Sequence, residues 1–349
     1  MQGLLAAVDD AHPDSAVDET WLHLNEELPS WLVALHKGES GGVTLPDDVT
    51  DALRHALELE QQAAIRFDFR REDNGYRERS QALSGEFDAD TRARILELTT
   101  ELGLVRPSQP EWTEHDRTLI LGGAHRSPLQ RATYAAHLES AGYQLGEPYF
   151  LGSPRLLMDQ PDERARTADY APGAVDEFDL MIAGAREAFG FSSEDVGFLC
   201  GCSTVEMICP QWPWRDTAAA AQTPPRFTHE RAAILDRAAG APGTVLSAST
   251  GRPPYRPDTT DTLALWARYA HPAAGERLLV VTTQVFVPFQ TFDSLKRLYL
   301  AHGVEIDTVG YGADWSGREE TPELLLQETL SGIRSARRLL VEAAQALAA

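Results

Sequence analysis

The sequence has few cysteines and no long apolar run. Three cysteines in 349 residues cannot form the disulfide framework that is typical of small secreted proteins. No apolar stretch approaches the ~20 residues that a membrane-spanning helix needs. The first residues also lack the basic region and cleavage pattern of a signal peptide. We therefore expect a cytoplasmic protein with reduced thiols and no membrane partner.

Positive charge is also scarce. The formal net charge of −22 would repel nucleic acids and anionic membranes, so neither is predicted as a partner. Lys37 and Lys296 are the only lysines, so nearly all of the positive charge comes from arginine. Together with the high alanine content, this usage indicates a GC-rich genome such as that of an actinobacterium.

The cysteines and histidines show no metal-binding pattern. Cys200 and Cys202 form a C-x-C pair, and Cys209 follows seven residues later. A structural zinc site usually has four ligands with C-x₂₋₄-C spacing, so ordinary buried thiols are favoured. The ten histidines form no H-E-x-x-H motif. No metal cofactor is expected.

The segment from residue 277 to 310 predicts a strand, a helix and a second strand. Residues 278–281 are apolar without alternation, which is typical of a parallel strand buried on both faces. Thr282, Thr283 and Gln284 follow at the strand's carboxyl end, the edge where ligands bind in open α/β sheets. The helix ends at Gly303. This pattern predicts an α/β protein with a small-molecule substrate.

A similar unit lies upstream. The apolar strand 118–121 runs into Gly122-Gly123, then His125 and Arg126, and a helix follows. Paired glycines let the backbone approach a ligand, and the helix N-terminus can bind an anion. The alternative is a tight turn with an exposed arginine, since neither G-x-G-x-x-G nor a P-loop is present. His125 is either a general acid or base or a solvent-exposed loop histidine.

The remaining pattern divides the chain near residue 107. Residues 1–106 predict a helical N-terminal subdomain, with helices near 47–70 and 89–102. Residues 107–349 predict a Rossmann-like, doubly wound α/β domain with a mainly parallel sheet. Its further elements are strands near 149–153, 196–199 and 243–247, and helices near 174–189, 232–239, 261–269 and 319–347.

A threonine-rich loop precedes one of these helices. Asp258 or Thr259 is a good N-cap, and a cap needs only one side chain. The surplus groups of Thr260 and Asp261 could then hold a ribose or phosphate. The alternative is an elaborate helix cap without a ligand.

The order of these pieces resembles the YdcF, SanA and ElyC family, over about residues 116–310. The family's L-G-G turn is matched by Leu121-Gly122-Gly123, and its second glycine turn by Gly152-Ser153. The further matches are Arg131 for the arginine of the first helix, Glu177 for the acidic helix start, residues 258–262 for the N-T-x-E-N cap, and residues 281–283 for the V-T-S strand end.

The resemblance implies a Rossmann-like fold and S-adenosylmethionine as a candidate cofactor. One departure concerns the histidine and arginine that usually follow V-T-S in the family. Here Phe286 and Phe289-Gln290 occupy those places, which puts the family's chemistry in doubt.

The function predicted from these observations is a soluble enzyme that binds a nucleotide-like small molecule and performs group transfer. The alternatives are a non-catalytic nucleotide-binding or sensor protein, and a hydrolase of a phosphorylated substrate. The candidate catalytic residues are His125 and Asp261. The candidate binding residues, expected in one pocket, are Gly122, Gly123, Arg126, Gly152, Ser153, Asp258, Thr259, Thr260, Thr282, Thr283 and Gln284.

The N-terminal helices carry an apolar set that must pack on something. They could close over the sheet edge as a lid that brings Arg70, Arg71, Arg77 and Arg79 to the ligand, or they could form a homodimer interface. The set includes Trp21, Trp31, Leu35, Leu53, Leu57 and Phe67.

Overall fold

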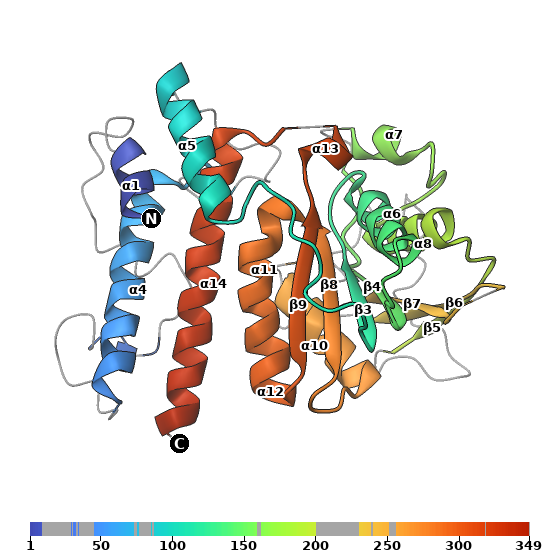
Figure 1. The fold of residues 1–349 in the computed structure, drawn as a ribbon. Helices are drawn as coiled ribbons and strands as arrows, with labels where there is room; N and C mark the ends of the chain where they lie inside the picture. The colour runs from blue at the N-terminus through green and yellow to red at the C-terminus, as the bar shows by residue number, and fades with distance from the viewer. Residues whose placement is uncertain are drawn as a thin grey trace. The chain divides into compact units, whose positions relative to one another are not determined.

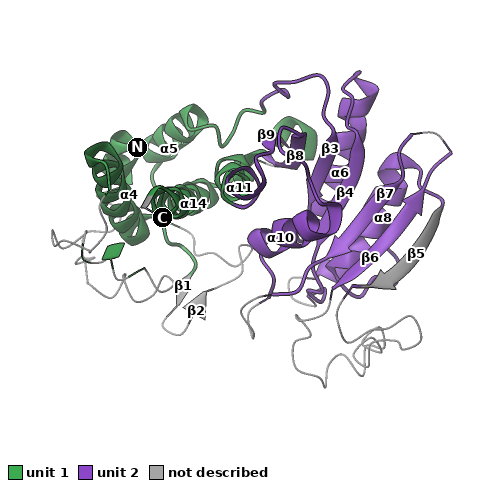
Figure 2. Ribbon diagram, turned by 90° about the horizontal axis from the view of Figure 1, so that it is seen from below, with its two compact units in different colours: residues 1–107, 284–296, 312–349 green, residues 108–283, 297–311 purple. Residues whose placement is uncertain are grey.

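Two units account for the part of the chain that the computed structural model describes (Figure 2). Unit 1 comprises 1–107, 284–296 and 312–349, and unit 2 comprises 108–283 and 297–311. The described residues are 1–8, 29, 31–32, 34, 45–72, 75–76, 85, 87–158, 162–199, 230–238, 240–250, 256–317 and 319–348.

Unit 2 is built on one sheet, in which the described residues form seven strands in the order β5-β6-β7-β4-β3-β8-β9 (Figure 1). Unit 1 contains a separate two-stranded hairpin, in which β1, Arg71–Glu72, pairs with β2, Gly75–Tyr76. The strands of the large sheet are β3 Arg117–Leu121, β4 Glu147–Gly152, β5 Ser193–Phe198, β6 Arg231–Asp236, β7 Gly243–Ser247, β8 Arg277–Thr283 and β9 Glu305–Tyr311.

The sheet is mostly parallel. Strands β7, β4, β3, β8 and β9 all run in one direction, whereas β6 pairs antiparallel with both β5 and β7. The chain forms β3 first, adds β4 and β7 on one side, and then adds β8 and β9 on the other. The α/β architecture is thus as predicted, and it is compatible with a Rossmann-like fold.

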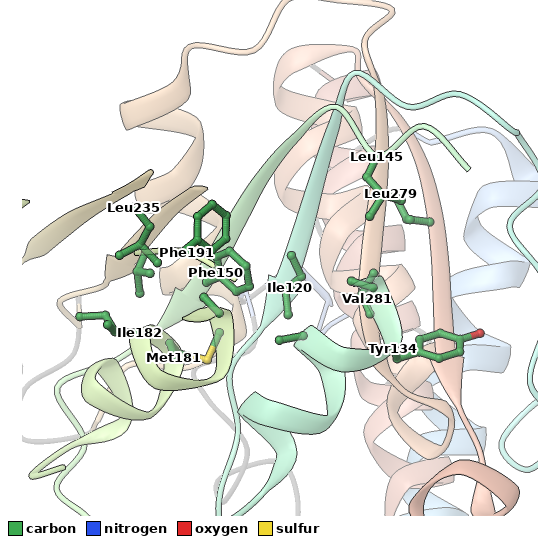
Figure 3. Close-up of a cluster of buried hydrophobic side chains, with 14 of the residues drawn as sticks. Ile120, Tyr134, Leu145, Phe150, Met181, Ile182, Phe191, Leu235, Leu279 and Val281 are labelled. Carbon is green, nitrogen blue, oxygen red and sulfur yellow. The ribbon is translucent and has the colours of Figure 1, made fainter. Parts of the chain in front are cut away.

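Helices cover both faces of this sheet. On one face lie α6, Ser127–Ser140, and α8, Glu177–Phe189, which pack against each other and against the central strands. Ile120, Phe150 and Val281 point to them, as Figure 3 shows. On the other face lies α10, Thr259–Ala270, whose Trp266 is fully buried. Because these strands are buried on both faces, their sequences are continuous apolar runs.

One element differs from the prediction. Residues 232–239 were expected to be helical, but β6 occupies Arg231–Asp236. Alanine favours a helix in isolation. Here Ala233 and Leu235 enter the core between the sheet and α8, and the backbone pairs with two neighbouring strands. Tertiary packing has overridden local propensity at this position.

Unit 1 is mainly helical, and its long C-terminal helix packs against the N-terminal helices. The described members of the predicted apolar set group here with α14: Leu53 and Leu57 are buried in one cluster with Val341, and Phe67 is buried in another with Leu326. Trp21, Leu35, Arg77 and Arg79 lie outside the described residues. The helices are α1 Gln2–Val8, α4 Asp47–Arg66, α5 Ala89–Glu101, α11 Val287–Ser294, α13 Ala313–Ser316 and α14 Pro322–Ala348.

The first segment of unit 1 ends at Pro107, and the sequence predicted a division of the chain after residue 106. However, residues 284–296 and 312–349, which the sequence placed in the α/β domain, group with the N-terminal helices. Within the described ranges, no helix is both long and apolar enough to span a bilayer.

Candidate functional site

The carboxyl ends of the parallel strands meet at one edge of unit 2. Ile120 of β3 pairs with Val281 of β8, and Leu121 pairs with Leu151 of β4. The segments that follow, beginning at Gly122, Ser153 and Thr282, therefore emerge along the same edge. The structure brings together most of the segments that the sequence assigned to one pocket.

Gln284 is one exception among the predicted binding residues. It belongs to unit 1, where its buried side-chain amide donates a 2.7 Å hydrogen bond to the carbonyl oxygen of Gly103. This bond fixes the end of α5, so Gln284 is left out of the candidate site in unit 2.

The turn after β3 passes very close to its neighbours. The amide of Gly122 donates a 2.6 Å hydrogen bond to the carbonyl oxygen of Leu151. A Cβ at this position would lie 2.7 Å from that same oxygen and would also meet the carboxylate of Glu177. Only glycine fits such a close approach.

The carbonyl groups of this turn are occupied within unit 2. Arg131 of α6 donates from Nη1 to the carbonyl oxygens of Gly122 and, at 3.0 Å, of Leu121. The next three carbonyls, of residues 123–125, accept hydrogen bonds from Arg155 Nη2 at 3.5 Å, the amide of Ser127 at 3.1 Å and the hydroxyl of Tyr170 at 3.1 Å.

The amide groups of the same turn behave differently. His125 donates its amide to the carboxylate of Glu163, at 2.8 Å. The amides of Gly123, Ala124 and Arg126 enter none of the hydrogen bonds among the residues that the structure describes. These three amides lie just before α6 and form a partly exposed group of donors that suits an anion, whereas Ser127 already donates its amide to Ala124 and Pro128 has no amide hydrogen.

The side chain of Arg126 is engaged with neighbouring residues. Its guanidinium donates to both carboxylate oxygens of Asp169, at 2.8 and 2.6 Å, and lies 5.5 Å from the ring centre of Tyr170. The hydrogen bond from Arg126 lowers the pKa of Asp169. The charge of Arg126 is therefore largely balanced by Asp169, so Arg126 would attract an anionic ligand less strongly than the sequence implied.

A buried ion pair lies beneath the turn. Arg155 follows β4 and donates from Nη1 and Nη2 to the two carboxylate oxygens of Glu163, both at 2.8 Å. Burial opposes the ionised form of Glu163, but the hydrogen bonds and charge of Arg155, with two backbone amides, lower its pKa to about 2. Glu163 is therefore ionised at every pH at which the protein would be assayed.

Ser153 and Glu177 form a second buried pair at this edge. The Ser153 hydroxyl donates to the carboxylate of Glu177, and the amide of Arg155 donates to Ser153 Oγ at 3.3 Å. Glu177 is the first residue of α8, where a negative charge interacts favourably with the helix dipole. Gly152, just before Ser153, pairs with Ser247 of β7.

A chain of hydroxyl groups crosses from β8 to β9 and α6. Thr283 Oγ1 accepts from Arg131 at 3.3 Å and donates to the Tyr311 hydroxyl at 3.1 Å. Tyr311 in turn donates to the side-chain oxygen of Gln130, at 3.1 Å. Arg131 thus joins the ends of β3 and β8, which are the two strands between which the order of the sheet reverses.

The threonine-rich loop is a capping box. Asp258 accepts from the amides of Thr260, at 2.8 Å, and Asp261, at 3.2 Å. The Asp261 carboxylate accepts from the amide of Asp258 at 3.0 Å, and Thr260 Oγ1 also donates to Asp258. Thr259 is the first residue of the helix. The groups that appeared surplus in the sequence therefore stabilise the start of α10.

A further buried pair lies behind the site. Asp176, the N-cap of α8, accepts a 2.5 Å hydrogen bond from Arg231 of β6, whose guanidinium lies 4.3 Å from the ring centre of Phe178. Burial raises the pKa of Asp176 to about 6, although the charge of Arg231 opposes this shift.

Sequence reasoning missed Arg155 and Glu163. Each lies in an irregular segment or a short helix, and neither has a partner at helical or strand spacing that could have identified the pair. The cysteine cluster, Cys200, Cys202 and Cys209, lies outside the described residues. Within those residues, no group of three histidine, cysteine or acidic side chains could hold a metal ion.

Two mycobacterial proteins are similar to this chain. The uncharacterized protein Rv3785 of Mycobacterium tuberculosis is 33% identical over 269 residues, which cover 74% of this chain and 70% of that protein. The uncharacterized protein Mb3814 of Mycobacterium bovis has the same identity and coverage. No protein-family model and no solved structure matches the chain.

Proposed function

This chain belongs to the family of the mycobacterial proteins Rv3785 and Mb3814, and we propose that it is an enzyme that binds a nucleotide-like small molecule and performs group transfer. S-adenosylmethionine is the cofactor that we would test first. The ligand would lie at the carboxyl edge of the sheet in unit 2, with an anionic group on the turn 122–126. From the composition we also expect a cytoplasmic protein without nucleic-acid or membrane partners.

The observation that carries this proposal is the polarity of the turn. Its carbonyls are occupied by Arg131, Arg155 and neighbouring groups, while the amides of Gly123, Ala124 and Arg126 make no hydrogen bond within the described residues. Such a group of amides at a helix N-terminus favours a phosphate or carboxylate.

The topology of the sheet supports the same location. The parallel strands β7, β4, β3, β8 and β9 follow the third-second-first-fourth-fifth order of doubly wound, Rossmann-like folds. In these folds the ligand binds where the order reverses, which here is at the carboxyl ends of β3 and β8. The turn 122–126 and Thr283 are the segments that follow these two strands.

Side chains near the carboxyl ends of β3 and β8 would carry out the group transfer. His125 remains our candidate general acid or base because it lies within the turn that would hold the anion. The role proposed for Asp261 loses support, since its carboxylate closes the capping box of α10. The proposal therefore does not depend on the loop 258–262.

The test begins with the purified full-length protein. Native mass spectrometry should show a bound small molecule, and amide-detected NMR should show shifts at Gly123 and Ala124 when S-adenosylmethionine or adenosine 5′-monophosphate is added. Turnover would be followed as S-adenosylhomocysteine release when compounds with a nucleophilic hydroxyl, amine or thiol are supplied as methyl acceptors. Unchanged amide resonances of the turn with every nucleotide-like ligand would contradict the proposal.

The alternative is a non-catalytic nucleotide-binding or sensor protein. One observation favours it, because the two buried carboxylates beside the turn, Glu163 and Glu177, are already hydrogen-bonded to Arg155 and Ser153. Binding without turnover would support this alternative. A hydrolase that uses Asp258, Asp261 and Glu177 as metal ligands is less favoured, since the first two side chains cap α10.

A further inference from the structure

The ion pair of Arg155 and Glu163 contacts the turn 122–126 at two points. Arg155 donates to the carbonyl oxygen of Gly123, and Glu163 accepts the amide of His125. Resting on the proposed function, we propose that they act as positioning residues, which hold the turn in the shape that accepts the anionic group of the ligand. Neither residue would need to touch the ligand.

Glu163 is at the centre of this arrangement. Its carboxylate is fully buried and accepts from Arg155 twice, from the amide of His125 at 2.8 Å and from the amide of Met158 at 2.9 Å. A carboxylate has about four acceptor sites, so these donors fill it. Any change to this side chain must therefore release at least one of the segments that it joins.

The segment held most directly is His125. Its φ of 53° lies in the left-handed region, which residues other than glycine rarely adopt because this backbone conformation costs free energy. The hydrogen bond to Glu163 holds its amide, and the Tyr170 hydroxyl holds its carbonyl. The surrounding contacts thus maintain a conformation that the chain would not favour alone.

Arg155 extends the same control to the rest of the edge. Its guanidinium reaches the carbonyl of Gly123, its amide donates to Ser153 Oγ, and its carbonyl accepts the amide of Glu177 at 2.9 Å. The ion pair therefore links the turn after β3 with the end of β4 and the start of α8.

The experiment titrates inorganic phosphate into the full-length protein and follows the amide resonances of Gly123 and Ala124. Glu163→Gln replaces an acceptor oxygen with an NH₂ donor that faces other donors, and Arg155→Lys removes the two-pronged guanidinium. Both variants should raise the apparent Kd for phosphate about tenfold, because small displacements of a binding group are costly.

The control is another two-pronged pair in the same unit, whose glutamate is partly exposed. Arg237 donates to both carboxylate oxygens of Glu139, at 3.0 and 2.8 Å, near the far end of α6. Glu139→Gln and Arg237→Lys remove the same kind of interaction away from the turn. They should leave the phosphate Kd unchanged.

The outcomes separate the two proposals. A wild-type turn that does not respond to phosphate would overturn the proposed function, and this proposal with it. A responsive wild type with a folded, equally responsive Glu163→Gln variant would overturn the positioning role alone. If Glu163→Gln does not fold, Glu163→Asp and Arg155→Lys decide, because a shortened or altered partner should still weaken phosphate relative to the controls.

Discussion

At the scale of single residues, the space beside Gly122 limits what the turn can contain. An added Cβ would press on the Leu151 carbonyl and on Glu177, and backbone cannot move aside as a flexible side chain can. Gly122→Ala should therefore destabilise the protein by about 1–3 kcal/mol in urea unfolding. Gly332→Ala is the control, because its Cβ would lie 3.7 Å from Pro288, at ordinary contact distance. Equal effects at the two positions would contradict this explanation.

The buried Asp176 predicts a pH dependence of stability. Its pKa is raised from 3.8 to about 6, so the folded state takes up a proton that the unfolded state does not. The resulting stabilisation, at most about 3 kcal/mol, is complete below pH 4 and is lost as the pH rises through 6. Asp176→Asn preserves an N-cap but removes this titration. The melting temperature of the wild type, relative to that of the variant, should be higher at pH 4.5 than at pH 7. The same difference in melting temperature at both pH values would refute the assignment.

At the scale of elements, the start of α10 shows how a cap can resemble a ligand site in sequence. Because Asp258 and Asp261 cap each other's backbone amides, replacing Asp261 with alanine should lower stability by about 0.5–2 kcal/mol. The affinity for adenosine 5′-monophosphate should not change. Calorimetry that gave weaker binding at an unchanged melting temperature would return Asp261 to the ligand site.

Strands that consist of continuous apolar residues could be predicted from the sequence. The apolar runs of β3 and β8 identified the parallel core, and from it the edge that carries Gly122 and Thr283. The prediction of a helix at residues 232–239 was wrong, because the alanines of β6 favour a helix until neighbouring strands supply backbone partners. The Arg155–Glu163 pair could not be predicted, because its contacts depend on where irregular segments meet after folding.

At the scale of the whole molecule, the grouping of helices could not be predicted from chain order. The sequence correctly indicated amphipathic helices at both ends of the chain, but an apolar stripe does not name its partner. In unit 1, α14 buries Leu326 with Phe67 and Val341 with Leu57. The described part of the N-terminal apolar set is thus buried within one unit, so a lid or a homodimer interface needs support from other observations.

Deletion of residues 1–106 tests this grouping. The truncated chain would keep α14 but lose the helices that cover Leu326 and Val341, which would leave a large apolar surface in water. We expect the remainder to aggregate or bind a hydrophobic dye, as size-exclusion chromatography and fluorescence would show. Leu57→Ala should cost about 2–5 kcal/mol, whereas Leu96→Ala on the exposed side of α5 should cost under about 0.5 kcal/mol. A truncated protein that stays monodisperse and folded would mean that α14 does not depend on the N-terminal helices.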